Sequence, residues 1–326
     1  MIARRQFTGR AAAALVAGLA APALLAGSGR AADARTLRIG WQKNGVLALA
    51  KSQGALEKRF ADKGIEITWA EFSSGPPLLE ALGAGALDFG PTGDVPPLFA
   101  QAAGGDLLYV GTYAGSPAGS GILVHKDSDI RTIADLKGRR LAFKRGSSAH
   151  NFTVKALRTA GLTTADIEPA DLAPPDALAA FRSGSVDAWT IWDPYFAVAE
   201  ADPAARVLTT AEGIVPAWSY FLANGSFTAA NPDLVVDTLD ELAAVGRAAQ
   251  GDLDATVPAL SKITGVPEAI TRVTLTRKGA DLGRVDGPVS IEAQVYQQAL
   301  ADEFHDLGIL PKKLNIQEIV WQPKAS

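Results

Sequence analysis

The chain has 326 residues, no cysteine, three histidines and a formal net charge of −4. Without cysteine it has no disulfide, no thiolate metal site and no cysteine nucleophile. No run of lysine and arginine indicates a nucleic-acid or anionic-membrane surface. The length is enough for two halves, each with a large core.

Residues 1–31 have the pattern of an export signal. The arginine pair of Arg4-Arg5-Gln6-Phe7 stands before an apolar stretch at residues 11–26. That stretch is shorter than the roughly 20 residues that span a membrane, so we predict a cleaved signal peptide of the twin-arginine type. Cleavage could follow Ala31 or Ala34, and we choose Ala31. The expected location is the periplasm.

Removal of that segment would make the chain clearly acidic. The remaining residues hold 27 basic against 35 acidic side chains, a formal charge of −8. An acidic surface repels nucleic acid and anionic lipid. We expect neither as a partner, and we expect a monomer.

Short apolar runs alternate with helical stretches, which is typical of strands joined by helical crossovers. The expected strands are 37–41, 65–72, 86–89, 107–112, 121–124, 140–143, 186–191 and 206–208, with 219–223 as a return strand. This pattern predicts an α/β fold with two lobes, each with mostly parallel strands. Lobe 1 comprises 35–118 and 222–326, and lobe 2 comprises 119–221.

An internal echo supports two related halves. Gly75-Pro76-Pro77 leads through an apolar helix to Gly85-Ala86-Leu87-Asp88, and Ala173-Pro174-Pro175 leads similarly to Gly184-Ser185-Val186-Asp187. Each copy has proline at a helix start and glycine at the helix end, where a positive φ is needed. The alternative is that helix–glycine–strand junctions are common to all α/β proteins.

Residues 144–151, Lys-Arg-Gly-Ser-Ser-Ala-His-Asn, follow a predicted strand and open a helix. Gly146 permits close backbone approach, Ser147 or Ser148 can donate a hydroxyl, and the free N–H groups of the first turn favour an oxyanion such as a sulfonate. Ser147 could instead be only an N-cap. We expect His150 to face the cleft, with a solvent-facing position as the alternative.

A second rim segment, Gly90–Pro97, also lies between a strand and a helix. Thr92 is placed to donate to a ligand, with Gly93 beside it. Asp94 either lies at the rim or caps the following helix. Because ligands of open parallel sheets lie outside the carboxyl ends of the strands, this segment and residues 144–151 are expected to face one cleft.

Residues 189–195, Trp-Thr-Ile-Trp-Asp-Pro-Tyr, end another predicted strand. Indole rings supply apolar area and one N–H donor, which suits a ligand with an anionic head and a carbon tail. We prefer Trp192 over Trp189 as a wall of the cleft. Asp193 could meet an amine, and Gln42 follows the first strand in a similar position.

Motifs for catalysis and metal binding are missing from the sequence. The three histidines are scattered without metal-ligand spacing. The sequence has no Walker phosphate loop, nucleophile elbow or dinucleotide fingerprint. We therefore expect no metal, no cofactor and no catalytic residue.

Taken together, these segments resemble the aliphatic sulfonate-binding proteins of ABC importers, within the wider group for nitrate, sulfonate, taurine and bicarbonate. The most specific likeness lies in residues 92–97, 146–151 and 192–195. The resemblance implies a two-lobed periplasmic binding protein fold of type II, each lobe a mostly parallel sheet flanked by helices, with a hinge between lobes that close around the ligand. It also implies that the sulfonate head is held by main-chain N–H groups and the two serines of the helix start, opposite Thr92 and Gln42. It also implies delivery to a membrane permease and its cytoplasmic ATPase.

We therefore predict a non-enzymatic binding protein for organosulfur uptake. The alternatives are a same-fold binding protein for taurine, nitrate or bicarbonate, an exported enzyme acting on sulfonates or sulfinates, or a sensor ectodomain. Residues 112–117 depart from the family pattern, which leaves the preference for the ligand's tail open. The predicted ligand-binding residues are Gln42, Thr92, Gly93, Asp94, Gly146, Ser147, Ser148, His150, Trp192 and Asp193.

Overall fold

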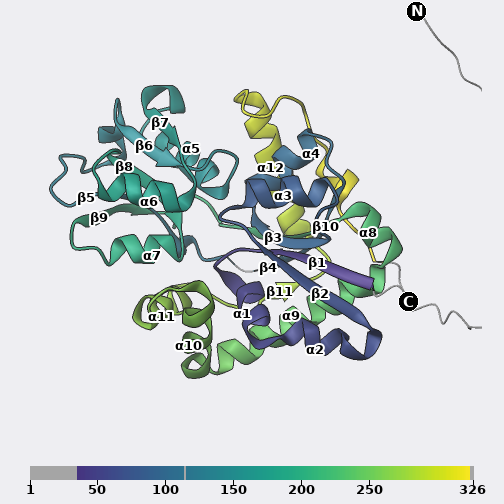
Figure 1. Ribbon diagram of the computed structural model, residues 1–326. Helices are drawn as coiled ribbons and strands as arrows, with labels where there is room; N and C mark the ends of the chain where they lie inside the picture. Colours follow the sequence, from purple (N-terminus) through teal and green to yellow (C-terminus); the bar gives the residue numbers. More distant parts are fainter. Residues whose placement is uncertain (1–34, 114, 324–326) are drawn as a thin grey trace, which may run out of the picture. The chain divides into compact units, whose positions relative to one another are not determined.

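Two β-sheets with helices packed against them make up residues 35–113 and 115–323, the part of the chain that the computed structural model describes (Figure 1). The predicted signal peptide, residues 1–31, lies outside these residues. No helix within the described ranges is long and apolar enough to cross a membrane. The expected α/β fold is confirmed, with two sheets that are mixed rather than mostly parallel in their pairing, since each also contains antiparallel pairs.

The first sheet has the strand order β11-β4-β10-β3-β1-β2. Its strands are β1 (Arg35–Trp41), β2 (Ile65–Glu71), β3 (Phe89–Gly93), β4 (Leu107–Tyr113), β10 (Ser219–Asn224) and β11 (Val285–Asp286). The second sheet has the order β7-β6-β8-β5-β9. Its strands are β5 (Ser120–His125), β6 (Arg140–Phe143), β7 (Glu168–Asp171), β8 (Ala188–Trp192) and β9 (Ala205–Thr210). The short strands β7 and β11 were not predicted from the sequence.

The α-helices are α1 (Gly45–Gln53), α2 (Ala55–Phe60), α3 (Gly75–Gly83), α4 (Val95–Ala102), α5 (Ser148–Thr159), α6 (Pro174–Arg182), α7 (Tyr195–Glu200), α8 (Gly225–Ala230), α9 (Pro232–Gly251), α10 (Leu253–Thr264), α11 (Glu268–Thr276) and α12 (Ile291–Asp306). Single-turn 3-10 helices are η1 (Ala61–Lys63), η2 (Pro117–Gly119), η3 (Ile133–Leu136), η4 (Thr164–Asp166) and η5 (Ile316–Ile319).

Antiparallel pairing occurs where the chain passes from one sheet to the other. After β4 the chain enters the second sheet as β5, which pairs antiparallel with β8 and β9. After β9 it returns as β10, which pairs antiparallel with β3 and β4. Each crossing begins at the carboxyl end of a strand and enters the other sheet from the same rim. The strand that follows the crossing therefore runs antiparallel to its neighbours. The two crossings therefore lie beside the rim where ligands of such sheets bind.

Strand β3 extends further than the sequence indicates. We expected a strand at 86–89 followed by a loop, whereas β3 runs from Phe89 to Gly93 and so includes Thr92. The strand continues because β10 offers partners along its length, with Tyr220 opposite Thr92 and Ser219 opposite Gly93. This pairing is long-range, and a local apolar pattern does not reveal it.

Each sheet is buried on both faces, as apolar strands predict. In β10, Phe221 belongs to one core cluster, while its neighbours Tyr220 and Leu222 belong to the cluster on the opposite face. In β5, Leu123 is likewise separated from Ile122 and Val124. This alternation follows from the two-residue period of a strand. It fixes which side chains at the strand ends turn toward the rim.

The internal echo corresponds to a repeated hydrogen-bond pattern. Gly85 and Gly184, which follow α3 and α6, have φ of 75° and 74°, which glycine adopts without strain. Asp88 then accepts from the backbone N–H of Arg38 at 2.7 Å, and Asp187 accepts from that of Arg140 at 2.7 Å. In both copies the aspartate just before the new strand is hydrogen-bonded to the backbone of the neighbouring strand, at the middle of β1 in the first copy and at the start of β6 in the second.

This repeat provides a matched stability test. Asp88 is fully buried and also accepts from the Arg38 guanidinium at 3.0 and 2.5 Å, whereas Asp187 is only half-buried. Asp88→Ala should therefore lower the free energy of unfolding by about 2 kcal/mol and Asp187→Ala by about 1 kcal/mol, measured by urea denaturation. Equal losses in the two variants would contradict this difference in burial.

Candidate functional site

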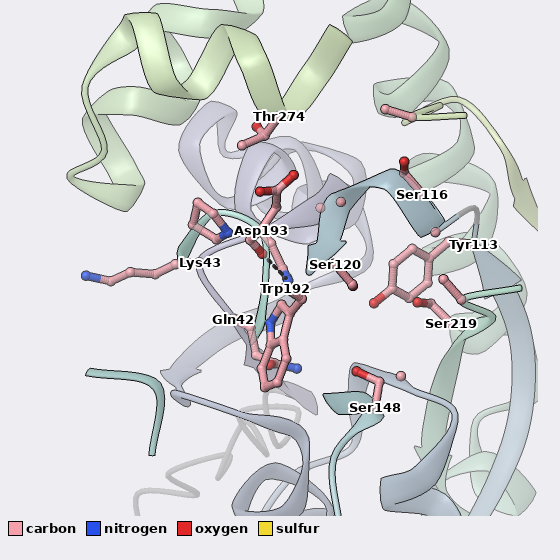
Figure 2. A pocket seen from close by; sticks show the side chains of 18 of the residues that line it. Gln42, Lys43, Tyr113, Ser116, Ser120, Ser148, Trp192, Asp193, Ser219 and Thr274 are labelled. Atoms are coloured by element: carbon pink, nitrogen blue, oxygen red, sulfur yellow. Dashed lines mark hydrogen bonds between the residues drawn. The ribbon is translucent and has the colours of Figure 1, made fainter. Parts of the chain in front are cut away.

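A cavity of about 210 Å³ lies between the rims of the two sheets. Figure 2 shows Ser148 at one end, Gln42 and Trp192 in the middle, and Asp193 and Thr274 at the other end. Eight of the ten residues predicted to bind ligand line this cavity: Gln42, Thr92, Gly93, Asp94, Ser147, Ser148, Trp192 and Asp193. Gly146 and His150 do not. Whether the eight contact a ligand stays a prediction.

The start of α5 forms one end of the pocket. Ser147 is the N-cap by position, but its hydroxyl does not cap the helix and donates instead to the carbonyl of Lys144 at 2.7 Å. The N–H groups at the start of a helix have no intrahelical partner and carry partial positive charge. Ser148 and Ala149, the first two residues of α5, line the cavity. This end of the pocket is therefore suited to an anion.

The rims of the two sheets touch at Gly93 and Ser148. A Cβ added to Gly93 would lie 2.9 Å from the Ser148 Cβ and 3.0 Å from its Oγ. Such distances are shorter than van der Waals contact, so any larger residue at position 93 would push α5 away. Glycine here is what lets the first sheet approach the helix start.

Thr92 brings an unpartnered polar atom to the pocket. Its side chain is fully buried, and its Oγ1 has no hydrogen-bond partner among the described residues. A buried hydroxyl without a partner is rare and indicates that water or a ligand completes its bonding. Gln42, at the end of β1, is also buried and donates from Nε2 to the Pro91 carbonyl at 3.1 Å. That bond fixes the Gln42 amide beside Thr92 in the lining.

Asp94 is a buried carboxyl in a polar cluster. Its Oδ2 accepts from Asn151 Nδ2 at 2.6 Å and from the Tyr296 hydroxyl at 2.7 Å, and its carbonyl accepts from Gln297 at 2.5 Å. The side chain does not cap α4, and Oδ1 has no partner among the described residues. Burial raises the pKa of Asp94 to about 6, although its hydrogen bonds oppose that shift. The contributions of α12 to this cluster were not foreseen, because no local spacing links residues 94 and 296.

Asp193 is held from two sides. Its Oδ1 accepts from the backbone N–H of Ala197 at 3.0 Å, which supports the first turn of α7, and its Oδ2 accepts from Arg277 Nε at 2.7 Å. Burial raises the pKa of Asp193 to about 6, against the lowering effect of Arg277. The ion pair was not predicted, because Arg277 follows α11 far along the chain.

His150 packs behind the pocket. Its ring stacks on Phe143 at 5.3 Å between centroids and meets Phe304 edge-on at 5.5 Å. Burial lowers its pKa to about 4, so the ring is neutral near pH 7. Its Nδ1 accepts from the backbone N–H of Gly146 at 3.3 Å. His150 and Gly146 thus shape the loop before α5 without lining the cavity.

Aromatic side chains enclose the middle of the pocket. Trp192 and Trp218 line it together with Tyr113, whereas Trp189 is fully buried in the core of the second sheet. Helices α10 and α11 cover another wall with Leu260, Thr274 and Leu275, among others. The sequence pattern alone does not assign these helices to the site. Their amphipathic pattern predicts a buried face but not what that face covers.

Histidine and carboxylate side chains of the described residues do not form a metal site. Within residues 35–113 and 115–323, no group of three or more His, Asp or Glu side chains could hold a metal ion.

Comparisons with known proteins place this geometry in a family. Residues 30–265 match the NMT1-like family. The periplasmic aliphatic sulphonate binding protein SsuA from Escherichia coli is 40% identical, with a TM-score of 0.79 over 89% of this chain and 93% of that one. The alkanesulfonate-binding protein SsuA from Xanthomonas axonopodis pv. citri, bound to MOPS, is 41% identical, with a TM-score of 0.83 over 88% of this chain and 98% of that one.

An enzyme shares the fold at a greater distance. The desulfurization enzyme DSZB is 18% identical, with a TM-score of 0.65 over 89% of this chain and 97% of that one. That level of identity shows a common fold alone. The family match and the two SsuA structures go further, and the expected resemblance to aliphatic sulfonate-binding proteins is confirmed: this chain belongs to the NMT1-like family.

Proposed function

We propose that the protein is the periplasmic solute-binding component of an ABC importer and captures aliphatic sulfonates for organosulfur uptake. The observation that carries this proposal is the pocket itself. The first turn of α5 and the Thr92 hydroxyl, which has no partner in the described part of the chain, lie at one end, and indole rings lie beside them. Such a pocket offers donors to an oxyanion and apolar area to a carbon tail. Its ligand is then passed to a membrane permease and its cytoplasmic ATPase.

The head group is held by Thr92, Gln42 and the α5 start. The N–H groups of Ser148 and Ala149, the Ser148 hydroxyl and the Thr92 hydroxyl supply donors, while Gly93 permits the approach. Ser147, whose hydroxyl is committed to Lys144, contributes its position at the helix end. Gly146 and His150 belong to the site as supports of this loop.

The tail lies against Trp192, with Tyr113 and Trp218 nearby. Asp193 is committed to Arg277, which weighs against its use for a ligand amine and so against taurine as the preferred ligand. Nitrate and bicarbonate have no tail and would leave the aromatic walls unfilled. Among the relatives, those at about 40% identity are named as binding proteins, whereas the enzyme is distant.

Two lobes close around the ligand in this proposal. Lobe 1 comprises residues 35–118 and 222–326, and lobe 2 comprises residues 119–221. The support is that β4 and β9 each end where the chain crosses between sheets. Binding shifts the balance between open and closed arrangements, and the permease reads the closed one. The protein acts as a monomer.

The substrate class is tested by thermal unfolding and calorimetry of the mature protein with ethanesulfonate, taurine, nitrate, sulfate and bicarbonate. A ligand that binds only the native state raises its apparent stability. The largest response is expected from the alkanesulfonate. A dominant response to nitrate or bicarbonate would replace the proposed substrate class.

Removal of either head-group hydroxyl should weaken sulfonate binding. Ser148→Ala and Thr92→Ala are each expected to lose about 1–3 kcal/mol of binding free energy by calorimetry, because a buried ligand oxygen loses its donor. Ser185→Ala, at an exposed position away from the pocket, is the matched control and should bind like the wild type. Wild-type affinity in both variants would show that the sulfonate binds at another site.

Sulfonate affinity should rise as the pH falls from about 8 to about 5. Burial raises the pKa of both Asp94 and Asp193 to about 6, and a bound anion raises each pKa further. Binding then takes up protons, so affinity is higher where the carboxyls are protonated. Calorimetry across this range should show a gain of about threefold or more in the wild type and less in Asp94→Asn. Asp129→Asn, which changes a surface carboxyl, should keep the wild-type profile; a flat wild-type profile would contradict the prediction.

Export is the remaining part of the proposal. The mature periplasmic protein is expected to begin at Ala32, and Arg4→Lys with Arg5→Lys should retain the precursor in the cytoplasm, because the twin-arginine receptor reads that pair. N-terminal sequencing of the periplasmic protein gives the cleavage site, and cell fractionation shows where the variant precursor accumulates. A full-length chain in the periplasm would contradict cleavage.

A further inference from the structure

We propose that Arg277 is a positioning residue that makes the pocket selective for anions: its guanidinium neutralises Asp193 in the pocket wall. This inference rests on the proposed function and deepens it. Without Arg277, the pocket would present a fixed carboxylate to an incoming sulfonate.

The contact between the two side chains is close and sheltered. Arg277 donates from Nε to Asp193 Oδ2 at 2.7 Å and from Nη2 to Oδ1 at 3.4 Å. It also donates from Nη2 to Glu200 Oε2 at 2.6 Å and lies over the Phe196 ring at 4.6 Å. The Arg277 side chain is 11% exposed and that of Asp193 17%. A sheltered two-point pair of this kind is worth more than a surface ion pair.

Asp193 cannot turn away from the pocket. Its backbone N–H donates to the Gly119 carbonyl at 2.8 Å, and its Oδ1 accepts from Ala197 N at 3.0 Å. Gly119 packs so closely that an added Cβ would lie 3.1 Å from Asp193 Oδ2. The carboxylate is therefore fixed in the wall that it shares with Trp192 (Figure 2).

The charged residues that line the pocket show why the Asp193 carboxylate needs a cation beside it. Among the lining residues, Asp94, Asp193 and Asp281 carry carboxyls and Lys43 carries an ammonium group. Asp281 is exposed to solvent, which screens it, and the Asp94 carboxyl accepts two hydrogen bonds in its own cluster. A sulfonate would meet repulsion from Asp193 unless a cation offsets it. Arg277 is the cation in contact with Asp193.

Arg277 also joins distant parts of the chain, since it follows α11 while Asp193 and Glu200 border α7. A purely mechanical tie would weaken whenever either partner is removed. Charge compensation predicts opposite signs for the two partners: loss of Arg277 weakens anion binding, and loss of the Asp193 charge strengthens it. This difference in sign separates the two roles.

The experiment compares ethanesulfonate affinity by calorimetry at about pH 9.5, because burial without Arg277 raises the pKa of Asp193 above its wild-type value of about 6. Arg277→Met should bind about tenfold more weakly than the wild type. Arg277→Met with Asp193→Asn should return to within about threefold of the wild type, and Asp193→Asn alone should bind more tightly. Arg272→Met removes an exposed ion pair between Arg272 of α11 and Asp254 of α10 and serves as the matched control with wild-type affinity.

A pH series adds a readout that a mechanical role would not move. The titratable and charged groups around Asp193 are Arg277 and Glu200, with Lys43 and Asp281 in the same lining. Arg277 lowers the pKa of Asp193 against the larger effect of burial. In Arg277→Met the fall in affinity with rising pH should therefore move to higher pH, and the double variant should lose that shift.

Unchanged affinity in Arg277→Met would overturn this inference. So would a double variant as weak as Arg277→Met, or an Asp193→Asn protein that binds more weakly than the wild type. If Arg277→Met does not fold, Asp193→Asn alone still decides by the sign of its effect. A wild type that does not bind ethanesulfonate would overturn the proposed function, and this inference with it.

Discussion

The contact between Gly93 and Ser148 is the constraint on which the pocket depends. It brings the carboxyl end of β3 against the first turn of α5, so that the buried Thr92 hydroxyl and the free N–H groups of a helix lie at one end of a single cavity. Neither group binds an anion well alone in water. Enclosed together, they gain from the lower dielectric, and leaving them unpaired costs free energy that a ligand recovers.

Burial in the pocket also makes each unpaired carboxylate unfavourable for a bound anion. Asp94 is surrounded by donors from α5 and α12, while Asp193 is paired with Arg277, and burial still raises the pKa of each. A cavity that holds an anion tolerates such carboxyls only where a proton or a guanidinium offsets them. The polar clusters at the two ends of the pocket are therefore part of its selectivity as well as of its architecture.

The sequence predicted those parts of the site that depend on one segment and its neighbours. Strand ends, helix starts and the repeated Gly-x-x-Asp junction have local signals, so eight of the predicted residues line the cavity. The contacts between segments far apart in the chain were not predicted. These are the pairing of β10 with β3 through Thr92, the hydrogen bond from Tyr296 of α12 to Asp94, and the ion pair of Asp193 with Arg277 after α11. The buried position of His150 behind the pocket was not predicted either, because a helix pattern does not show which side chain packs on Phe304.

The same details fit the proposed role of a binding protein, because the groups that could act as a base are already engaged. General base catalysis needs a group with a pKa near the working pH, within hydrogen-bond reach of the ligand. The pKa values of Asp94 and Asp193, about 6, lie near that range, but both carboxyls are already hydrogen-bonded. Asp94 accepts from Asn151 and Tyr296, and Asp193 accepts from Ala197 and Arg277. The ring of His150 lies behind the lining, its Nδ1 already accepts from Gly146, and its pKa of about 4 makes it a weak base. Ser148 has no hydrogen-bonded base to activate it among the described residues, which suits its proposed role as a donor to an anion. Hydroxyl and N–H groups held in place in this way stabilise a bound oxyanion and leave its bonds intact.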